Sequence, residues 1–271
     1  MTLVATVEAY LIKALPPKAV KALQQVKAKL PVHLPQAAPI AVMYLNDGET
    51  RSYVGINNFY SFLLSSETTD AIAELQFFSP NGERILRHKT TLQHFGATTI
   101  DVAALFSRNR VESPYGIVAL QLTPHHPRRF AYRELGETFS HFFIFYQGAG
   151  SVAQVHPLSH IGSHNKVSDR FESSQVITTH GLVSVEALQY NPGTRSVRVE
   201  YCLVDTETRE IVARAASTVP GLGAVRVPFA MRDLVRVPLR VRLTMDHLPS
   251  GNSKPMLRRS YAGGIHTMSH S

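Results

Sequence analysis

The chain is organised around YQGAGSVAQVHPLSH, residues 146–160, because a shortened copy of it, YAGGIHTMSH, occurs at residues 261–270. Two further matches precede these copies in the same order. FGATTIDV (95–102) parallels GLGAVRV (221–227), and LQLT (120–123) parallels VRLT (241–244). The sequence therefore predicts two related modules in tandem.

Apolar and polar residues alternate within both modules, and β-branched and aromatic residues are frequent. The first module contains AVMYL, YVGINNFYSFLL, AIAELQFF, TTIDV, IVALQLT and FFIFY, and the second contains VSVEALQY, SVRVEYCLV, EIVARAAS, AVRVPF, LRVRLTM and LRRSYA. Such alternation is typical of half-buried strands, and no helix-length segment separates these runs as a parallel sheet would require. We therefore expect an all-β fold of two tandem antiparallel β-sandwich domains related by the internal repeat.

A turn motif in the first module fixes one pair of strands. Pro80-Asn81-Gly82 combines three residue types that favour tight turns. This motif predicts that residues 71–78 and 83–90 form consecutive antiparallel strands joined as a hairpin.

Residues 1–38 differ from the rest of the chain. Apolar residues recur there at helical spacing on both sides of Pro16-Pro17, which predicts two short helices followed by a Pro-rich linker. The basic residues of this arm, with no acid among them, are Lys13, Lys18, Lys21, Lys27 and Lys29. A basic amphipathic arm can dock on acidic partners or anionic membranes, and the alternative is that its apolar stripe packs on the first domain.

The predicted division of the chain follows from these changes in pattern. The arm and linker occupy residues 1–38, the first sandwich residues 39–165 and the second sandwich residues 166–271. The boundary between the sandwiches is expected in IGSHNKVSDR, where glycine, serine, asparagine and charged residues replace the alternation.

The composition is that of a globular protein with a basic surface. The 271 residues are 44% hydrophobic and 18% charged, with a net charge of +8. A positive balance favours an acidic partner: nucleic acid, anionic lipid or an acidic protein surface. No apolar run approaches the roughly 18 residues of a membrane span, and the first residues lack the pattern of a secretory signal. We expect a cytoplasmic protein that can associate peripherally with a membrane.

No stretch carries a recognisable catalytic or cofactor motif. A GxSxG nucleophile turn is absent, and the Gly-rich segment 148–151 lacks the lysine and following helix of a phosphate-binding loop. His156, His160 and His164 are spaced by four, but a proline and a glycine interrupt any helix that would align them. Cys202, the single cysteine, is expected to be a buried strand residue. We therefore expect no enzyme activity, no cofactor and no metal.

Arginines are concentrated in the strands of the second module. The alternation predicts that four of them share one sheet face: Arg198, Arg226, Arg240 and Arg242. In the first module the loop PHHPRRF adds Arg128 and Arg129. The alternative to a dedicated anion-binding surface is an ordinary solvated face on which acids such as Glu186 and Glu200 are interspersed.

The repeated motif also predicts equivalent positions in the two modules. Tyr146 and Tyr261 are expected in equivalent strands, and His156 and His266 at equivalent positions near the module ends. Their expected role is structural, because turn backbone groups that are buried need hydrogen-bond partners.

The strand pattern resembles the single-module bacterial β-sandwiches of the sensory-rhodopsin-transducer type. The resemblance rests on the polar turn SSETTD, the strand AELQFF, the hairpin at Gly82, a TTL run at 90–92 and a closing IDV at 100–102. It implies a cytoplasmic, non-catalytic module that contacts a membrane protein. It includes no site residue, and the N-terminal arm and the second module depart from that family.

The repeat, the basic arm and the absence of a catalytic motif together predict a non-enzymatic interaction or scaffold protein. It would be an accessory subunit that docks on a membrane protein complex or another acidic partner through the five lysines and six arginines named above. Carbohydrate binding is the alternative, although sugar platforms use flat aromatic faces and the chain has no Trp. Nucleic-acid binding is less favoured, because aromatic residues are sparse among the arginines.

Overall fold

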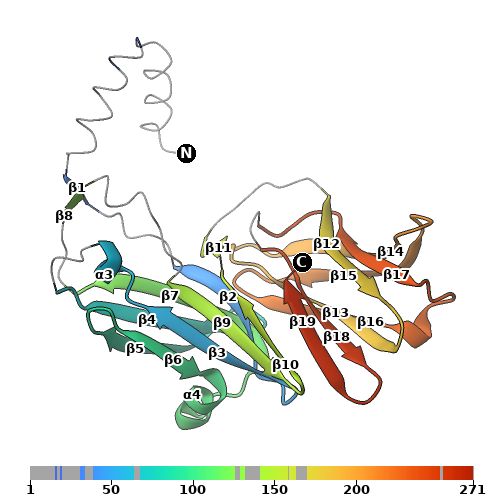
Figure 1. The fold of residues 1–271 in the computed structure, drawn as a ribbon, viewed down its shortest axis with the longest axis horizontal. Coiled ribbons are helices and arrows are strands. Elements are labelled where there is room, and N and C mark those ends of the chain that lie inside the picture. Colours follow the sequence, from blue (N-terminus) through green and yellow to red (C-terminus); the bar gives the residue numbers. More distant parts are fainter. Residues whose placement is uncertain are drawn as a thin grey trace.

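The computed structural model describes residues 16, 19, 31–33, 39–63, 68–125, 129–131, 141–157, 159–162, 170–250 and 253–270. Most of the predicted helical arm lies outside these residues, including Lys13, Lys18, Lys21, Lys27 and Lys29, and so does Arg128. Strand β1 (Pro31–His33) pairs antiparallel with β8 (Arg129–Ala131). The remaining strands form two sandwich-like halves (Figure 1).

The first half contains two antiparallel sheets, with strand orders β11-β2-β7-β4-β5 and β10-β9-β3-β6. The strands are β2 (Ile40–Leu45), β3 (Thr50–Asn57), β4 (Ala71–Phe78), β5 (Arg84–Leu92), β6 (Ala97–Asp101), β7 (Tyr115–Pro124), β9 (Phe142–Gly148), β10 (Ser151–Val155) and β11 (Ser159–His160). Two short helices, α3 (Tyr60–Leu63) and α4 (Val102–Asn109), connect strands of this half.

The second half also contains two antiparallel sheets. We call β12-β17-β14-β15 the pocket sheet and β16-β13-β18-β19 the junction sheet. The strands are β12 (Phe171–Thr178), β13 (Leu182–Tyr190), β14 (Val197–Asp205), β15 (Ile211–Val219), β16 (Ala224–Ala230), β17 (Arg240–Met245), β18 (Met256–Tyr261) and β19 (Ile265–His270). A short 3-10 helix, η2 (Met231–Asp233), follows β16.

The two halves have the same strand order. Matched along the chain, β2, β7, β4 and β5 correspond to β12, β17, β14 and β15, and β10, β9, β3 and β6 correspond to β19, β18, β13 and β16. The paired sequence segments also fall on corresponding strands, β6 with β16 and β7 with β17. The all-β, antiparallel fold is thus confirmed, while the limits of the two domains stay predictions.

Alternating burial explains why these segments form sheets with a shared interior. Ala73, Leu75 and Phe77 of β4 are fully buried, as every second residue, and Val199 and Tyr201 of β14 are buried on either side of the exposed Glu200. Each large apolar side chain buried in this way contributes about 1.5–3 kcal/mol. The inward-facing rows of both sheets therefore supply the core of each half.

The hairpin at Pro80-Asn81-Gly82 is confirmed. Strands β4 and β5 pair antiparallel, and Gly82 has φ +87°, a conformation that favours glycine. The turn also touches the second half, because a Cβ added to Gly82 would overlap the carbonyl oxygen of Gly221.

Helix α4 was not expected from the sequence. The Asp101 carboxylate caps it by accepting a hydrogen bond from the Ala104 amide at 3.1 Å, and Val102, Leu105 and Phe106 are buried at helical spacing. A capping residue and an apolar face are both readable in the sequence, but the helix has only eight residues. Helix α3 likewise interrupts a run, YVGINNFYSFLL, that was expected to be strand throughout.

A buried ion cluster joins the halves. Asp47, in the β2–β3 turn, accepts hydrogen bonds from Arg226 at 2.8 Å and from Arg258 at 2.6 Å. Both arginines also bind Glu186 of β13, at 2.7 Å from Arg226 and 2.6 Å from Arg258. The side chains of Asp47 and Arg258 are only 6% and 4% exposed. Charge-assisted hydrogen bonds therefore tie a turn of the first half to the junction sheet.

Apolar and backbone contacts extend this junction. The Ala224 amide donates to the Pro80 carbonyl at 3.0 Å, and the Tyr190 hydroxyl donates to Ser159 Oγ at 3.0 Å. Strands β10 and β19 lie side by side there (Figure 1). Four residues on the outer face of the junction sheet pack into the core of the first half: Leu188, Tyr190, Ala224 and Met256. The first half therefore covers the outer face of the junction sheet.

The two copies of the repeated motif begin on corresponding strands, but their residues do not occupy equivalent positions along those strands. Tyr146 lies in β9 and Tyr261 in the corresponding strand β18, as predicted. Tyr261 ends its strand, whereas β9 continues to Gly148. His156 follows the end of β10, whereas His266 is an early residue of β19. The predicted equivalence of the two histidines is wrong, because the two hairpins turn at different points of the motif.

Candidate anion-binding site

The structure places the predicted arginines in different surroundings. Arg226 lies on β16 and is engaged in the buried cluster, whereas Arg198 lies on β14 and Arg240 and Arg242 lie on β17. The prediction that these four residues share one sheet face is wrong, because β16 belongs to the junction sheet and β14 and β17 to the pocket sheet. Arg129, from the other predicted group, lies in β8.

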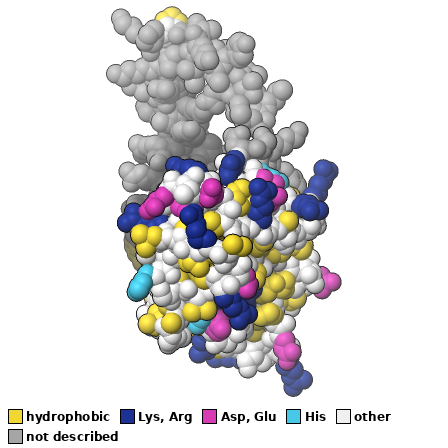
Figure 2. All heavy atoms as spheres, turned by 90° about the vertical axis from the view of Figure 1, so that its right-hand side faces the viewer, with side chains coloured by type: hydrophobic (Ala, Val, Ile, Leu, Met, Phe, Trp, Pro, Cys, Tyr) yellow, Lys and Arg dark blue, Asp and Glu magenta, His cyan; other side chains and the backbone are white. Residues whose placement is uncertain are grey.

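The outer face of the pocket sheet is mixed in charge. Arg214 of β15 pairs with Glu200 of β14 at 3.2 Å, and both side chains are largely exposed. Figure 2, which views the second half from its free side, shows basic and acidic side chains interspersed. This face is therefore no continuous basic surface, and any anion site on it must come from a local arrangement.

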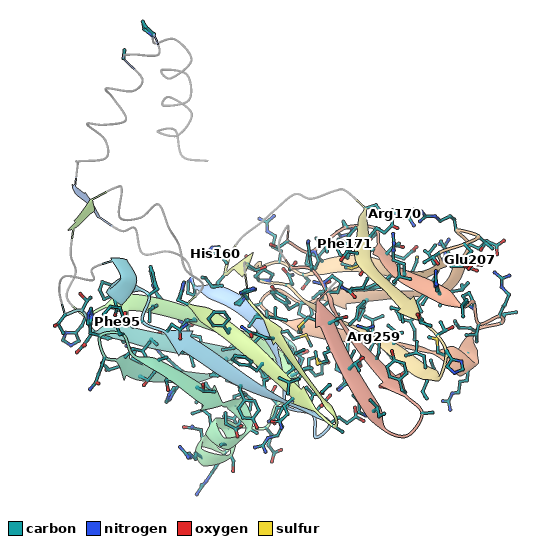
Figure 3. The ribbon with its side chains drawn as sticks, viewed as in Figure 1. Phe95, His160, Arg170, Phe171, Glu207 and Arg259 are labelled. Atoms are coloured by element: carbon teal, nitrogen blue, oxygen red, sulfur yellow. The ribbon has the colours of Figure 1, made fainter. Side chains whose placement is uncertain are left out.

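Such an arrangement exists near the β14–β15 turn. A pocket of about 200 Å³ is lined by Arg170, Glu172, Val204, Thr206, Arg209, Arg242 and Thr244, and we call it the arginine pocket. Arg170 directly precedes β12, and Glu207 lies in the turn after β14 (Figure 3). The lining residues thus come from three neighbouring strands and the turn that follows one of them.

Strand register explains how these residues meet. Arg242 of β17 pairs with Val204 of β14, and Thr244 pairs with Glu172 of β12 across the other edge of β17. A register shift in β12 between Glu172 and Val176 interrupts its alternation next to the pocket. The pocket therefore forms where the bulged edge strand meets β17.

The turn that carries Arg209 is held by Asp205. The Asp205 carboxylate accepts a hydrogen bond from the Glu207 amide at 2.9 Å, and the Arg209 amide donates to the Asp205 carbonyl at 3.0 Å. Arg209 has φ +62°, in the left-handed region, which closes the turn before β15. The side chain of Arg209 is consequently presented at the rim of the pocket, 69% exposed.

Ion pairs and one hydroxyl contact order the pocket. Glu172 Oε1 pairs with Arg242 Nη1 and lies 3.3 Å from Arg209 Nη1. Arg170 Nη2 donates to Thr244 Oγ1 at 3.4 Å. The hydrogen bond from Arg242 holds the pKa of the Glu172 carboxyl below its ordinary value, so this group is ionised at neutral pH. The Nε of Arg242 is buried and has no hydrogen-bond partner among the described residues.

The charge of the lining favours anions. Three arginines and one glutamate leave a net charge of +2. A guanidinium group presents its donors in a planar fork that fits carboxylate and phosphate oxygens, and it stays charged at every physiological pH. The arrangement can therefore hold an anionic group of a partner or a small anion.

The sequence singled out only one residue of this pocket, Arg242. Arg170 and Arg209 were missed because the first precedes β12, which was not among the expected strands, and the second lies in a turn. Arg209 lies between Thr208 and Glu210, and a single arginine in this context gives no reason to expect an anion site.

The other candidate residues form no comparable site. His156 follows β10, His160 lies in β11, and His164 is outside the described residues. Within the described ranges, no group of three or more His, Cys, Asp or Glu is placed to hold a metal ion. Cys202 is a buried residue of β14, as predicted, and burial together with Glu200 raises the pKa of its thiol.

Comparison with known proteins adds only distant likenesses. No family model matches the chain, and no curated protein matches it. Among solved structures, it is similar to the exo-β-D-glucosaminidase CsxA, with 9% identity and a TM-score of 0.18 over 75% of this chain and 24% of the other. It is also similar to the N-terminal CBM22-1–CBM22-2 tandem domain of Paenibacillus barcinonensis Xyn10C, with 9% identity and a TM-score of 0.18 over 88% and 80%. The chain spans about a quarter of CsxA, and TM-scores this low carry no functional argument.

Proposed function

We propose that this is a non-enzymatic binding protein that docks an acidic protein partner on the outer face of the pocket sheet. The observation that carries the proposal is the arginine pocket, which is lined by three arginines from separate elements and a single glutamate. Carboxylates on a partner surface fit this lining, because arginine binds them through paired charge-assisted hydrogen bonds.

The junction between the halves supports a scaffold role. The ion cluster around Asp47 and the apolar residues of the junction sheet hold the second half against the first. A partner bound at the pocket would therefore keep a fixed position relative to the surface of the first half. We propose on this basis that the protein is an accessory subunit that positions one component relative to another.

A membrane protein complex is the partner that we favour within this proposal. In the part of the chain that the structure describes, no helix has the length and apolarity needed to cross a membrane. The protein would bind an acidic surface of such a complex from the cytoplasm, with the basic residues of the segment 1–38 as a second contact.

Retention on immobilised poly-glutamate tests this function. Arg209→Gln removes an exposed arginine of the pocket, and Arg214→Gln removes an equally exposed arginine of the same sheet outside the pocket. Each of the two pairs with one glutamate, so the variants are matched in charge. We expect Arg209→Gln to reduce retention, Arg214→Gln to leave it nearly unchanged, and added salt to weaken it.

Three further binding assays distinguish an acidic protein partner from nucleic acid, anionic lipid and carbohydrate. The same proteins are passed over single-stranded DNA, vesicles containing phosphatidylglycerol, and a glycan array. Absence of retention on poly-glutamate, or an equal effect of the two substitutions, would contradict the proposal. Hits on the glycan array without binding to poly-glutamate would favour the carbohydrate alternative instead.

A further inference from the structure

The arginine pocket has a charge that a single carboxylate does not balance. Its lining carries +2, from Arg170, Arg209 and Arg242 against Glu172. A glutamate or aspartate side chain brings one negative charge, whereas a phosphate monoester brings about 1.5–2 at neutral pH. A dianionic phosphoryl group therefore neutralises this lining, and a carboxylate leaves it positive.

The donors of the pocket suit a group with several acceptor oxygens. The guanidinium groups approach from three elements, which allows each to bind a different oxygen, as a phosphoryl group requires. Thr244 Oγ1 already accepts from Arg170, so its own hydrogen can be donated to a ligand, and Thr206 adds a second hydroxyl.

The size of the pocket fits a phosphoryl group with the carbon that bears it. A volume of about 200 Å³ is many times what a single water molecule needs. Val204 supplies an apolar wall against which the carbon chain of a phosphorylated side chain can pack. The pocket is therefore larger than a bare oxyanion needs.

Glu172 competes with any anion that enters. Its Oε1 pairs with Arg242 and lies 3.3 Å from Arg209, so it already occupies two of the three arginines. An incoming anion must share these donors with a carboxylate that is ionised. Removing the charge of Glu172 should consequently strengthen anion binding, an effect that a purely structural ion pair would not have.

From this arrangement we propose that the arginine pocket binds a phosphate dianion, either free phosphate or the phosphoryl group of a phosphorylated side chain on the partner. The inference rests on the proposed function, because it names the chemistry of the acidic partner. It assigns Arg170, Arg209 and Arg242 as the binding residues and Glu172 as the group that weakens binding.

Isothermal titration of the full chain tests the inference with three probes: inorganic phosphate, a short peptide containing phosphoserine, and the same peptide with glutamate at that position. We expect phosphate and the phosphoserine peptide to bind more tightly than the glutamate peptide. Tighter binding of the phosphoserine peptide than of inorganic phosphate would identify a phosphorylated side chain as the source, and equal or weaker binding would identify the free anion.

Three variants show whether binding occurs in the pocket. Loss of one charge-assisted contact in Arg209→Gln should weaken phosphate binding roughly tenfold, and Arg214→Gln should change it little. Glu172→Gln should strengthen it. The two arginines are largely exposed and Glu172 is 44% exposed, and unchanged thermal unfolding of each variant confirms that the fold is retained.

The outcomes distinguish this inference from the proposed function. No binding of either phosphate probe, or no difference between Arg209→Gln and Arg214→Gln, overturns the inference. If the protein is still retained on immobilised poly-glutamate in that case, the proposed docking of an acidic partner stands. If phosphate binds and the protein is not retained on poly-glutamate, the inference stands as a small-anion site and the proposed docking function is overturned.

Discussion

Asp47 is the residue on which the contact between the halves most depends. Its carboxylate binds Arg226 and Arg258, both from the other half, while almost entirely buried. Removing one partner from a buried ion pair leaves charge without compensation and costs about 3 kcal/mol or more. We expect Asp47→Asn to lower the free energy of unfolding by about 3 kcal/mol, measured from urea denaturation midpoints.

The matched control is an exposed ion pair on the same protein. Arg214 and Glu200 are 62% and 47% exposed, and such pairs contribute less than about 1 kcal/mol. Arg214→Gln should therefore leave the midpoint nearly unchanged. If Asp47→Asn has an equally small effect, the ion cluster does not hold the halves together.

The Asp47 carboxylate also makes the stability of the folded protein depend on pH. Burial alone would raise the pKa of Asp47, but Arg258, the Thr50 amide and Arg226 outweigh burial, and the pKa lies below its ordinary value. A lowered pKa means that the stabilisation is complete above about pH 4, the ordinary value, and is lost as the pH falls through the folded-state value.

We therefore expect the stability difference between the wild type and Asp47→Asn to be largest near neutral pH and to shrink below about pH 4. Urea denaturation of both proteins over a pH series measures this difference. A difference that stays constant into strongly acidic solution would show that the charge of Asp47 is not what stabilises the junction.

The residues of the buried ion cluster show what could not be predicted from the sequence. The alternation in β16 correctly placed Arg226 on the face opposite Val227 and Phe229, but it could not show that the first half covers this face. Asp47 is separated from Arg226 and Arg258 by 179 and 211 residues. Only the docking of the halves brings these charges together, and no local pattern encodes it.

Among the elements, the β4–β5 hairpin is both a turn within the first half and a contact with the second. Gly82 has φ +87°, and a Cβ at this position would overlap the Gly221 carbonyl. Gly150, in the β9–β10 turn, has φ +81° but nothing within 4 Å of an added Cβ. The two glycines therefore have the same type of backbone conformation, but only Gly82 lies against the second half.

We expect Gly150→Ala to lose about 1 kcal/mol from its unfavourable φ alone, and Gly82→Ala to lose clearly more because the turn must also withdraw from the second half. Thermal unfolding of both variants measures the difference. Equal losses would mean that the hairpin does not press against the second half.

The elements that the sequence predicted are those with strong alternation. β4, β7, β13, β14 and β17 were all expected, because each carries a row of apolar residues that the core requires. β12 and β19 were missed because both lie at sheet edges, where polar residues such as Ser173 and Ser269 fall within the strand. Since β12 supplies one wall of the arginine pocket, the site could not be assembled without it.

At the scale of the molecule, the halves share buried structure. Leu188, Tyr190 and Met256 of the second half lie in the core of the first, next to the ion cluster. Separation of the halves would expose these apolar side chains and leave the buried charges without partners. We therefore expect a single cooperative thermal transition in differential scanning calorimetry, and two resolved transitions would contradict a shared core.

The same arrangement explains which surface remains available to a partner. The first half covers the outer face of the junction sheet, whereas the outer face of the pocket sheet stays open to solvent (Figures 1 and 2). The sequence predicted that arginines of the second half contact a partner. The structure divides that set, since Arg226 joins the two halves and Arg242 lines the pocket.

Hydrogen–deuterium exchange with and without poly-glutamate tests most directly whether this open face binds an acidic partner. We predict slower exchange of the amides in β12, in β17 and in the turn around Arg209, with little change in the first half. The Arg209→Gln variant should lose this protection. Protection confined to the first half, or no protection of the pocket sheet while poly-glutamate is bound, would contradict the assignment of the arginine pocket as the docking site.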